Sequence, residues 1–218
     1  SNICTAQALL AIMASMYAVY HGPIGMKAIA RRIHDMSTAL AEGLSKLGCV
    51  LTHQNFFDCV RVELGEELQK KIKTLAENRN INFWYTEQAI QINLDETATE
   101  VDMVQILQIF AEAMNRTAPA LSVPAGLRIP GNLVRYSEFL THPIFNRHHT
   151  ESALMRYIKS LENKDLSLVH SMISLGSCTM KLNAASELIP VSWPEFANIH
   201  PFVPEDQAAG YLDMIREL

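Results

Sequence analysis

One helix limits the folds open to this chain more than any other feature. Between Pro23 and Leu47, apolar residues recur every three or four positions, which places them on one face of an α-helix. They are Ile29, Ile33, Met36, Leu40, Leu44 and Leu47. Pro23 suits the first turn of a helix, Lys46 lies in the last turn, and Gly48 suits the left-handed residue that follows. The sequence therefore predicts a long amphipathic helix that ends at Leu47.

The preceding segment, Ala6 to Tyr20, is small and apolar nearly all round. A helix without a polar face is a buried helix, so we expect this one to lie inside the protein. The sequence His21-Gly22-Pro23 separates it from the next helix. Gln7 and Ser15 interrupt the apolar run, which stays below the roughly 18 residues of a membrane span. No basic segment precedes it, as a signal peptide requires, so we expect a soluble protein without a membrane partner.

The period of the apolar pattern then changes to two. Residues 60–64 and 90–94 alternate apolar and polar side chains, as half-buried strands do, and Phe83 and Tyr85 indicate a third strand. Helical spacing returns from Glu66 to Arg79. These elements predict short strands that pair mainly antiparallel.

A further helix follows the strands. Thr97 and Glu100 match the pattern of a capping box, which opens a helix. One face of this helix carries Met103, Leu107, Phe110 and Met114. Strand, helix, paired strands and helix, preceded by a long helix, describe a small open α/β layer. We therefore expect one α/β domain over residues 1–116.

Regular periodicity ends after residue 116. Four prolines occur between residues 117 and 148, namely Pro119, Pro124, Pro130 and Pro143, and they indicate a linker. Helical spacing returns over residues 154–161, and a tail interrupted by prolines follows, with a last short helix near Pro204. The segment 149–218 has too few apolar residues for a core of its own. We expect it to be a largely helical and irregular extended arm that docks on something else.

Composition excludes several functional classes. Apolar residues make up 49% of the 218 residues and charged residues 19%, which suits a chain with a core. The net charge is −5 and the basic residues are scattered, so a nucleic-acid partner is not expected. The four cysteines, Cys4, Cys49, Cys59 and Cys178, are far apart, which predicts free thiols and no zinc site. His142, His148 and His149 lack an acidic or cysteine partner at ligand spacing and are interpreted as a polar surface turn.

The segment from Leu175 to Asn183 is the one cluster that has local features of a site. Its hydroxyls and successive backbone N–H groups suit an anion such as a phosphate or carboxylate. The local sequence alone favours a simpler interpretation, in which Ser177 or Thr179 caps a short helix. Cys178 beside His170 or His200 is a weaker hypothesis for a nucleophile, because one sequence cannot show that they meet.

Motifs spread over the whole chain resemble one family, the decarboxylating glycine dehydrogenases or P-proteins. Residues 1–11 read SNICTAQALLA, 16–23 MYAVYHGP, 142–151 HPIFNRHHTE, 161–166 LENKDL, 175–185 LGSCTMKLNAA, 193–197 WPEFA and 200–202 HPF. They occur in the order that the family has. Members of the family have two related halves, each similar to a fold-type-I pyridoxal-phosphate (PLP) enzyme.

The resemblance implies a place for each part of this chain. Residues 1–116 correspond to the small C-terminal α/β domain of the first half, 117–148 to a proline-rich linker, and 149–218 to the N-terminal arm of the second, catalytic half. The family's Schiff-base lysine lies in an Asn-Leu-His-Lys-type segment, which does not occur here. Lys181 belongs to the Thr-Met-Lys motif and does not take that role. This chain alone is therefore expected to be inactive and to bind no cofactor.

The resemblance also implies which residues lie near the site of the whole enzyme. Ser177, Cys178 and Thr179 would lie near the cofactor or the substrate carboxylate. His200 would line the same cleft, and Asn2 and Cys4 would approach its entrance. No catalytic residue and no metal ligand is expected within this chain.

The implied activity of the parent protein is an oxidoreductase step of the glycine cleavage system. With pyridoxal 5'-phosphate it releases CO2 from glycine and passes the aminomethyl group to the lipoyl arm of H-protein. The implied partners are glycine, lipoylated H-protein, the remaining parts of the P-protein and further copies in a homo-oligomer. The expected location is the bacterial cytoplasm, or the mitochondrial matrix of a eukaryote. The alternative is a free-standing amino-acid-binding or assembly module, built on residues 50–114, without catalysis.

Overall fold

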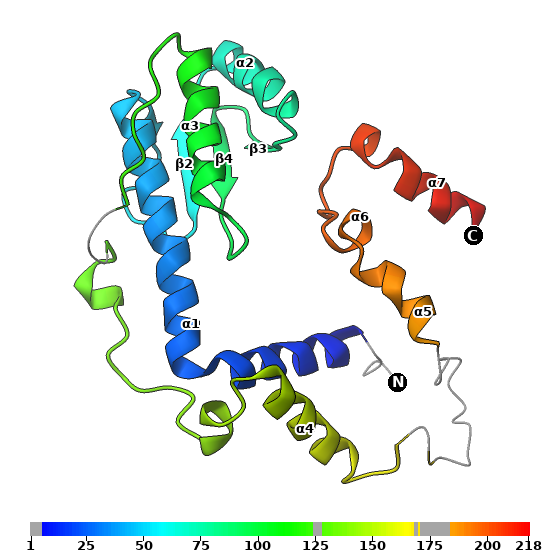
Figure 1. The fold of residues 1–218 in the computed structure, drawn as a ribbon. Helices are drawn as coiled ribbons and strands as arrows, with labels where there is room; N and C mark the ends of the chain where they lie inside the picture. The colour runs from blue at the N-terminus through cyan, green and yellow to red at the C-terminus, as the bar shows by residue number, and fades with distance from the viewer. Residues whose placement is uncertain (1–5, 124–127, 168–169, 171–183) are drawn as a thin grey trace. The chain divides into compact units, whose positions relative to one another are not determined.

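A computed structural model describes residues 6–123, 128–167, 170 and 184–218 (Figure 1). The chain divides into two compact units, one up to Leu154 and one from Met155 onward. The first unit contains a sheet covered by helices, and the second contains helices and short turns.

The helix α1 runs from Ala6 to Lys46 and changes direction at Gly22 (Figure 1). Gly22 has φ 60° and ψ −177°, a conformation that glycine adopts far more easily than other residues. Pro23 follows and has no N–H to donate, so the helical hydrogen bonds stop and begin again here. The predicted break between two helices is confirmed.

The part of α1 after Pro23 is the predicted amphipathic helix. Its apolar face is buried at Met36, Leu40, Leu44 and Leu47. Gly48 has φ 82°, and its N–H donates to the carbonyl of Ser45 at 2.9 Å, so the predicted left-handed end is confirmed. The guanidinium of Arg116 donates to the carbonyl of Leu47, which ties the end of α1 to the end of a later helix.

The part of α1 before Gly22 does not have the predicted burial. Leu9, Leu10, Ile12 and Met13 are 59%, 64%, 56% and 58% exposed. The prediction that residues 6–20 lie inside the protein is therefore wrong for the exposed part of the segment, whereas Val19, close to the bend, is buried as expected. The physical reason is that the described residues place the core around the second part of α1 and leave the first part beyond it.

By length and composition alone, α1 is long and apolar enough to cross a membrane, and it is the one such helix among the described residues. The bend at Gly22 divides α1 into two parts that run in different directions (Figure 1).

Four antiparallel strands form a sheet in the order β1-β2-β4-β3. They are β1 (Val50–Leu51), β2 (Cys59–Glu63), β3 (Trp84–Tyr85) and β4 (Ala89–Asn93). Val60 pairs with Ile92 and Val62 with Ile90, and all four side chains are buried. Arg61 pairs with Gln91 on the opposite face. The alternation predicted for both long strands is confirmed, and the sheet has one apolar and one polar face.

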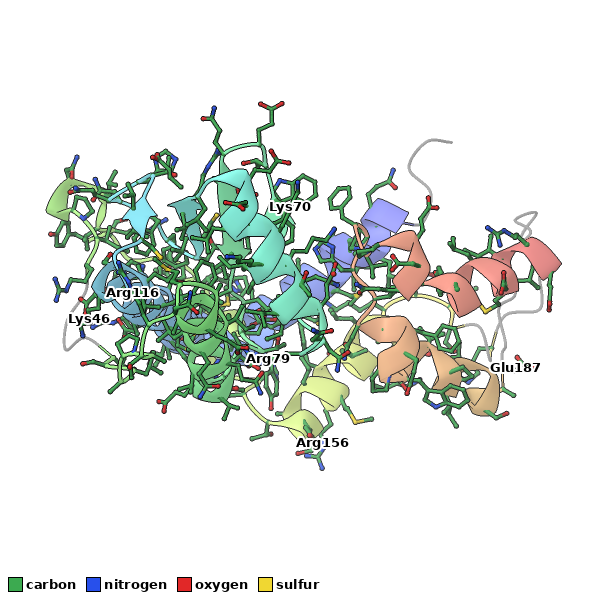
Figure 2. The ribbon with its side chains drawn as sticks, turned by 90° about the horizontal axis from the view of Figure 1, so that it is seen from above. Lys46, Lys70, Arg79, Arg116, Arg156 and Glu187 are labelled. Carbon is green, nitrogen blue, oxygen red and sulfur yellow. The ribbon has the colours of Figure 1, made fainter. Side chains whose placement is uncertain are left out.

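Three helices enclose the apolar face of this sheet. They are the second part of α1, α2 (Glu66–Glu77) and α3 (Glu100–Ala113). Met103, Leu107, Ile109 and Phe110 of α3 are fully buried between them. Arg79, just after α2, pairs with Glu112 of α3 at 2.5 Å and joins the two helices at the surface (Figure 2). A small antiparallel sheet with helices agrees with the predicted α/β class.

The predicted capping box lies two residues from the observed one. Thr99 is the N-cap of α3, and its hydroxyl accepts from the N–H of Asp102 at 3.3 Å. The N–H of Thr99 in turn donates to the Asp102 carboxylate at 2.8 Å. Thr97 instead donates its N–H and hydroxyl to Asp95, at 2.8 and 2.6 Å, in the turn before the helix. The assignment to Thr97 and Glu100 was wrong because both threonines fit the pattern.

Residues 128–149 run beside α1 and contact it at several points. They contain two 3-10 turns, η1 (Gly131–Leu133) and η2 (Pro143–Asn146). Lys27 of α1 lies over the ring of Phe139, with Nζ 5.5 Å from the centroid, and Arg135 lies 5.3 Å from the same centroid. The Nδ1 atom of His149 lies 2.6 Å from the carbonyl oxygen of Tyr20. This segment is therefore irregular but bound to α1 by specific contacts.

The helix α4 (Glu151–Glu162) leads from the first unit into the second. The second unit further contains α5 (Ala185–Leu188), η3 (Ile189–Ser192), α6 (Pro194–Ala197), η4 (Glu205–Gln207) and α7 (Ala209–Glu217). Among its described side chains only Ser167 and Ala208 are buried. Phe196 holds the turns together through ring contacts with Trp193 at 6.3 Å and Tyr211 at 6.4 Å. The described part of this unit has no large apolar core.

Candidate functional site

A groove of about 420 Å³ lies in the first unit beside α1. One wall is a stripe of α1 that includes His34, Glu42 and Lys46, and the other wall comes from Leu51 of β1 and Phe56 of the loop after it. Arg128 closes it from the later segment. The stripe arises because residues four apart lie on the same face of a helix. The bottom of the groove is mainly apolar, and its rim carries charged side chains.

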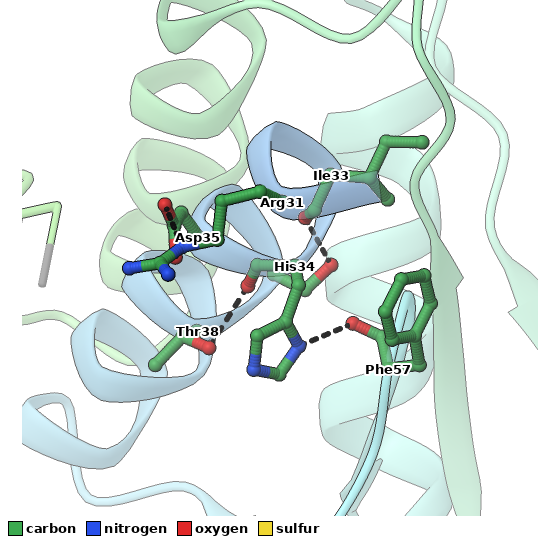
Figure 3. Close-up of polar contacts among 7 residues, drawn as sticks. Arg31, Ile33, His34, Asp35, Thr38 and Phe57 are labelled. Atoms are coloured by element: carbon green, nitrogen blue, oxygen red, sulfur yellow. Dashed lines mark hydrogen bonds and ion pairs between the residues drawn. The ribbon is translucent and has the colours of Figure 1, made fainter. Parts of the chain in front are cut away.

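His34 is the buried polar group of this groove. It is 1% exposed, and its Nδ1 atom lies 3.0 Å from the carbonyl oxygen of Phe57 (Figure 3). A carbonyl oxygen only accepts, so Nδ1 carries the hydrogen and, in the neutral ring, Nε2 is an acceptor. Nε2 is buried and has no hydrogen-bond partner in the structure. The ring is held by stacking on Phe57, with centroids 5.5 Å apart.

The helix around His34 is fixed by hydroxyls that bond back to its own carbonyls. Thr38 donates to the carbonyl of His34 at 2.9 Å, and Ser37 donates to that of Ile33 at the same distance (Figure 3). Arg31 and Asp35 form an ion pair at 2.7 Å on the adjoining surface. These bonds satisfy the hydroxyls within the helix, so Thr38 has no hydroxyl hydrogen free for a ligand.

The rim carries a paired and an unpaired charge. Glu42 and Arg128 form an ion pair at 3.2 Å, and because the Arg128 side chain is largely exposed the pair contributes little to stability. Lys46 ends α1 beside Arg116 (Figure 2) and has no ion pair among the described residues. The groove therefore offers a cation, an ion pair and one buried acceptor. No nucleophile and general base are in hydrogen-bond contact within it among the described residues.

Among the six residues predicted to lie near a cofactor or substrate, His200 is described. It is exposed, and its Nδ1 accepts from the N–H of Phe202 at 3.0 Å, so Nε2 is the ring atom that remains available. Ser177, Cys178, Thr179, Asn2 and Cys4 lie outside the described residues, as does Lys181. The structure therefore does not test whether these residues come together.

The proposed pairing of Cys178 with a histidine also falls outside the described residues on its cysteine side. His170 is described and lies 2.9 Å from the hydroxyl of Ser167, between Nδ1 and Oγ. The two residues are three apart in one turn. A general-base histidine is usually oriented by a carboxylate, and none is bonded to His170 within the described residues. We therefore interpret this contact as a local turn interaction.

The histidines of the predicted polar turn have structural roles. Nδ1 of His142 accepts from the N–H of Ile144 at 3.2 Å and caps η2, and His149 binds the end of the first part of α1. No group of three or more histidine, cysteine or acidic side chains that suits a metal ion occurs among the described residues.

Cys49 and Cys59 are free thiols, as the sequence predicts. Burial raises the pKa of the Cys49 thiol to about 11. Burial, assisted by the Asp58 carboxylate, also raises the pKa of Cys59. Both are protonated at neutral pH, so neither is an activated nucleophile.

Sequence reasoning did not find the groove. The available signal was a histidine inside the apolar stripe, at His34 between Ile33 and Met36. Other residues that line the groove lie as far along the sequence as Arg128. Their contact with α1 produces no pattern within either segment of the sequence.

Comparisons with known proteins agree on one family. Residues 1–110 match the family model described as glycine cleavage system P-protein. The whole chain is 53% identical to the glycine dehydrogenase (decarboxylating) of Flavobacterium johnsoniae. It is 52% identical to the protein of the same name from Vibrio parahaemolyticus. The chain spans 23% of the length of each of these relatives.

Proposed function

Because this chain belongs to the glycine cleavage system P-protein family, we propose that its parent protein decarboxylates glycine. The observation that carries the proposal is the 53% identity, which extends over the whole chain, to a glycine dehydrogenase (decarboxylating). In the proposed reaction the parent releases CO2 from glycine and transfers the aminomethyl group to the lipoyl arm of H-protein. Its proposed partners are glycine, lipoylated H-protein and further copies of the P-protein.

We further propose that this chain joins the two halves of the parent. Residues 1–116 would be the small domain of the first half, 117–148 a linker, and 149–218 the arm of the second half. The sheet with helices over residues 23–114 and the described part of the second unit, which has no large core, support this division.

The groove does not fit pyridoxal phosphate, the cofactor that the family implies. Such a site needs a lysine for the aldehyde, an acidic partner for the ring nitrogen and donors for the phosphate. In the groove, Lys46 lies on the exposed last turn of α1, and Glu42 is paired with Arg128. We therefore place the cofactor in other parts of the parent and assign no cofactor step to the groove.

The segment 176–179 stays the proposed contact of this chain with the site of the parent. Ser177, Cys178 and Thr179 would lie near the cofactor or the substrate carboxylate, His200 would line the cleft, and Asn2 and Cys4 its entrance. For His200 the described geometry supports contact through Nε2, since Nδ1 is already an acceptor for Phe202.

A direct experiment compares the full-length protein with this chain. Radioactive CO2 released from carboxyl-labelled glycine is measured with and without lipoylated H-protein. We expect release that depends on H-protein from the full-length protein, and none from the 218-residue chain. A full-length protein that folds and binds PLP but releases no CO2 contradicts the proposed activity. Release by the isolated chain contradicts its proposed inactivity.

The groove favours a second candidate, a module that binds a small amino acid without catalysis. Its basis is the buried acceptor Nε2 of His34 together with the free cation of Lys46. An ammonium group would donate to the first, and a carboxylate would pair with the second. Titration calorimetry of the chain with glycine tests this candidate, with Lys46→Met as the variant and Lys71→Met, on the exposed side of α2, as the control. Absence of a heat signal that depends on Lys46 removes it.

A further inference from the structure

The first part of α1, residues 7–21, exposes an unusual surface. No Asp, Glu, Lys or Arg occurs between Gln7 and Met26. The side chains of Leu9, Leu10, Ile12 and Met13 are each more than half exposed. Soluble proteins rarely leave such a contiguous apolar surface in water unless something covers it.

This helical segment has two distinct faces without charge. At 100° per residue, the large apolar side chains fall on one side and mostly small ones on the other. The large face consists of Leu9, Leu10, Ile12, Met13, Met16, Tyr17 and Tyr20, and the small face of Gln7, Ala8, Ala11, Ala14, Ser15 and Ala18. A helix that has to keep one side in water places charged residues there, and this one has none. Both faces are therefore suited to burial.

The segment is held in a defined direction by its own unit. The backbone carbonyl of Phe145 would lie 2.5 Å from a Cβ atom on Gly22, and the ring of His149 would lie 2.7 Å from it. The same histidine contacts the carbonyl oxygen of Tyr20 at 2.6 Å. The bend is thus packed on both sides, and the apolar helix projects from a fixed base.

Two kinds of protein partner would cover such a helix, and the geometry favours one. A second copy meeting the helix across a two-fold axis would bury the same face in both copies and leave the other face in water. The curated relatives hold more than three quarters of their length outside the part that this chain matches, since the chain spans 23% of each. That additional polypeptide is long enough to enclose both faces.

We infer that residues 7–21 form an internal helix of the parent protein, enclosed on both faces by parts of the polypeptide outside this chain. The large face packs against an apolar surface of those parts. The small face, which after Gln7 has only alanine and serine, lets a second element approach closely. The inference rests on the proposed place of this chain within a longer P-protein and does not depend on the reaction.

Photo-crosslinking in the full-length protein tests the partner. p-Benzoylphenylalanine replaces Met13 on the large face, and cross-linked peptides are mapped by mass spectrometry. We expect a product with the mass of one chain, joined to a peptide outside these 218 residues. A product with twice the mass, or a cross-link to a peptide within these residues, overturns the inference.

Two variants of the full-length protein test the two faces separately. Met13→Glu places a charge on the large face, and Ala14→Leu enlarges the small face. Their controls are Val101→Glu on α3, which replaces a residue 65% exposed, and Lys71→Leu on α2. Each test variant should shorten the lifetime in thermolysin by roughly tenfold or more, as the loss of one buried contact does, whereas each control should change it little.

If the lifetimes of both test variants equal those of their controls, the helix is exposed in the parent, which overturns the inference. A loss in Met13→Glu alone means that one face is covered, which also overturns it. Neither readout uses catalysis, so failure of the proposed activity would not be mistaken for failure of the inference.

Discussion

The carbonyl oxygen of Phe145 occupies the place beside Gly22 that a side chain would need, because a Cβ atom there would lie 2.5 Å from it. The two residues are far apart in the sequence. Their contact sets the bend in α1 and binds the segment after residue 128 to that helix. It thereby links the apolar helix 7–21 to the sheet domain.

This contact predicts that Gly22→Ala is strongly destabilising. Alanine at φ 60° is strained, and its Cβ atom would collide with backbone, which cannot rotate away. We expect a loss of about 2–4 kcal/mol in the free energy of unfolding, measured by urea denaturation. Gly131→Ala is the control, because its Cβ atom would meet nothing within 4 Å. Equal stability of the two variants would contradict the role given to the bend.

A second glycine allows α1 and α3 to approach closely. A Cβ atom on Gly43 would lie 2.6 Å from Cδ2 of Leu107, a fully buried side chain. Gly43→Ala should cost about 1–3 kcal/mol through overpacking, and Leu107→Ala about 2–5 kcal/mol through a cavity. The double variant should lose less than the sum, since each change relieves the other. Urea unfolding of the four proteins measures this coupling, and strict additivity would mean that the two residues do not crowd each other.

The capping box of α3 can be located by two single variants. Thr99→Ala removes the hydroxyl that accepts from Asp102 and should cost about 1 kcal/mol. Thr97→Ala removes a bond to Asp95 in an exposed turn and should cost clearly less. The urea concentrations at the unfolding midpoints of the two variants show which threonine caps α3. A larger loss at Thr97 would restore the assignment made from the sequence.

Cys49 predicts a dependence of stability on alkaline pH. Burial raises its pKa from the ordinary 9.0 to about 11, against the smaller effect of the Arg116 guanidinium. The unfolded chain releases this proton at lower pH than the folded chain, so the stability present below pH 9 is lost as pH rises through about 11. The loss should reach roughly 2 kcal/mol. Cys49→Ala lacks this group, so the difference between the two proteins isolates it from tyrosines and lysines. Parallel curves for the two proteins would refute the raised pKa.

The sequence predicted the elements of residues 23–114 well, because their signals are local. The stripe from Met36 to Leu47 and the alternation in β2 and β4 each follow from a period within one element. The capping box was misplaced because Thr99 and Asp102 fit the pattern as well as Thr97 and Glu100 do. Burial of residues 6–20 was wrong for this chain, because burial depends on what surrounds a helix and not on the helix alone.

The candidate site was less predictable for a related reason. The groove joins Glu42 to Arg128, and an ion pair between residues so distant leaves no pattern in either segment. His34 gave a weak signal, since a histidine on an apolar face is more often a satisfied core residue than a ligand-binding one. Its unpartnered Nε2 atom was visible only once the ring was placed against Phe57.

The last prediction concerns Ser177 and Thr179 in the full-length protein. If the segment 176–179 holds an anionic group of the substrate or cofactor, Ser177→Ala and Thr179→Ala should each weaken binding or glycine decarboxylation. One charge-assisted hydrogen bond is worth about 1.5–3 kcal/mol, or roughly one to two decades in affinity or rate. If the hydroxyls only cap a helix, each variant should instead lose about 1 kcal/mol of stability. Melting temperature and decarboxylation are therefore measured on the same variants, with Ser160→Ala on the exposed surface of α4 as the control. Lower stability with unchanged kinetics per folded molecule would make both residues structural, because an anion contact cannot be lost without a change in binding or rate.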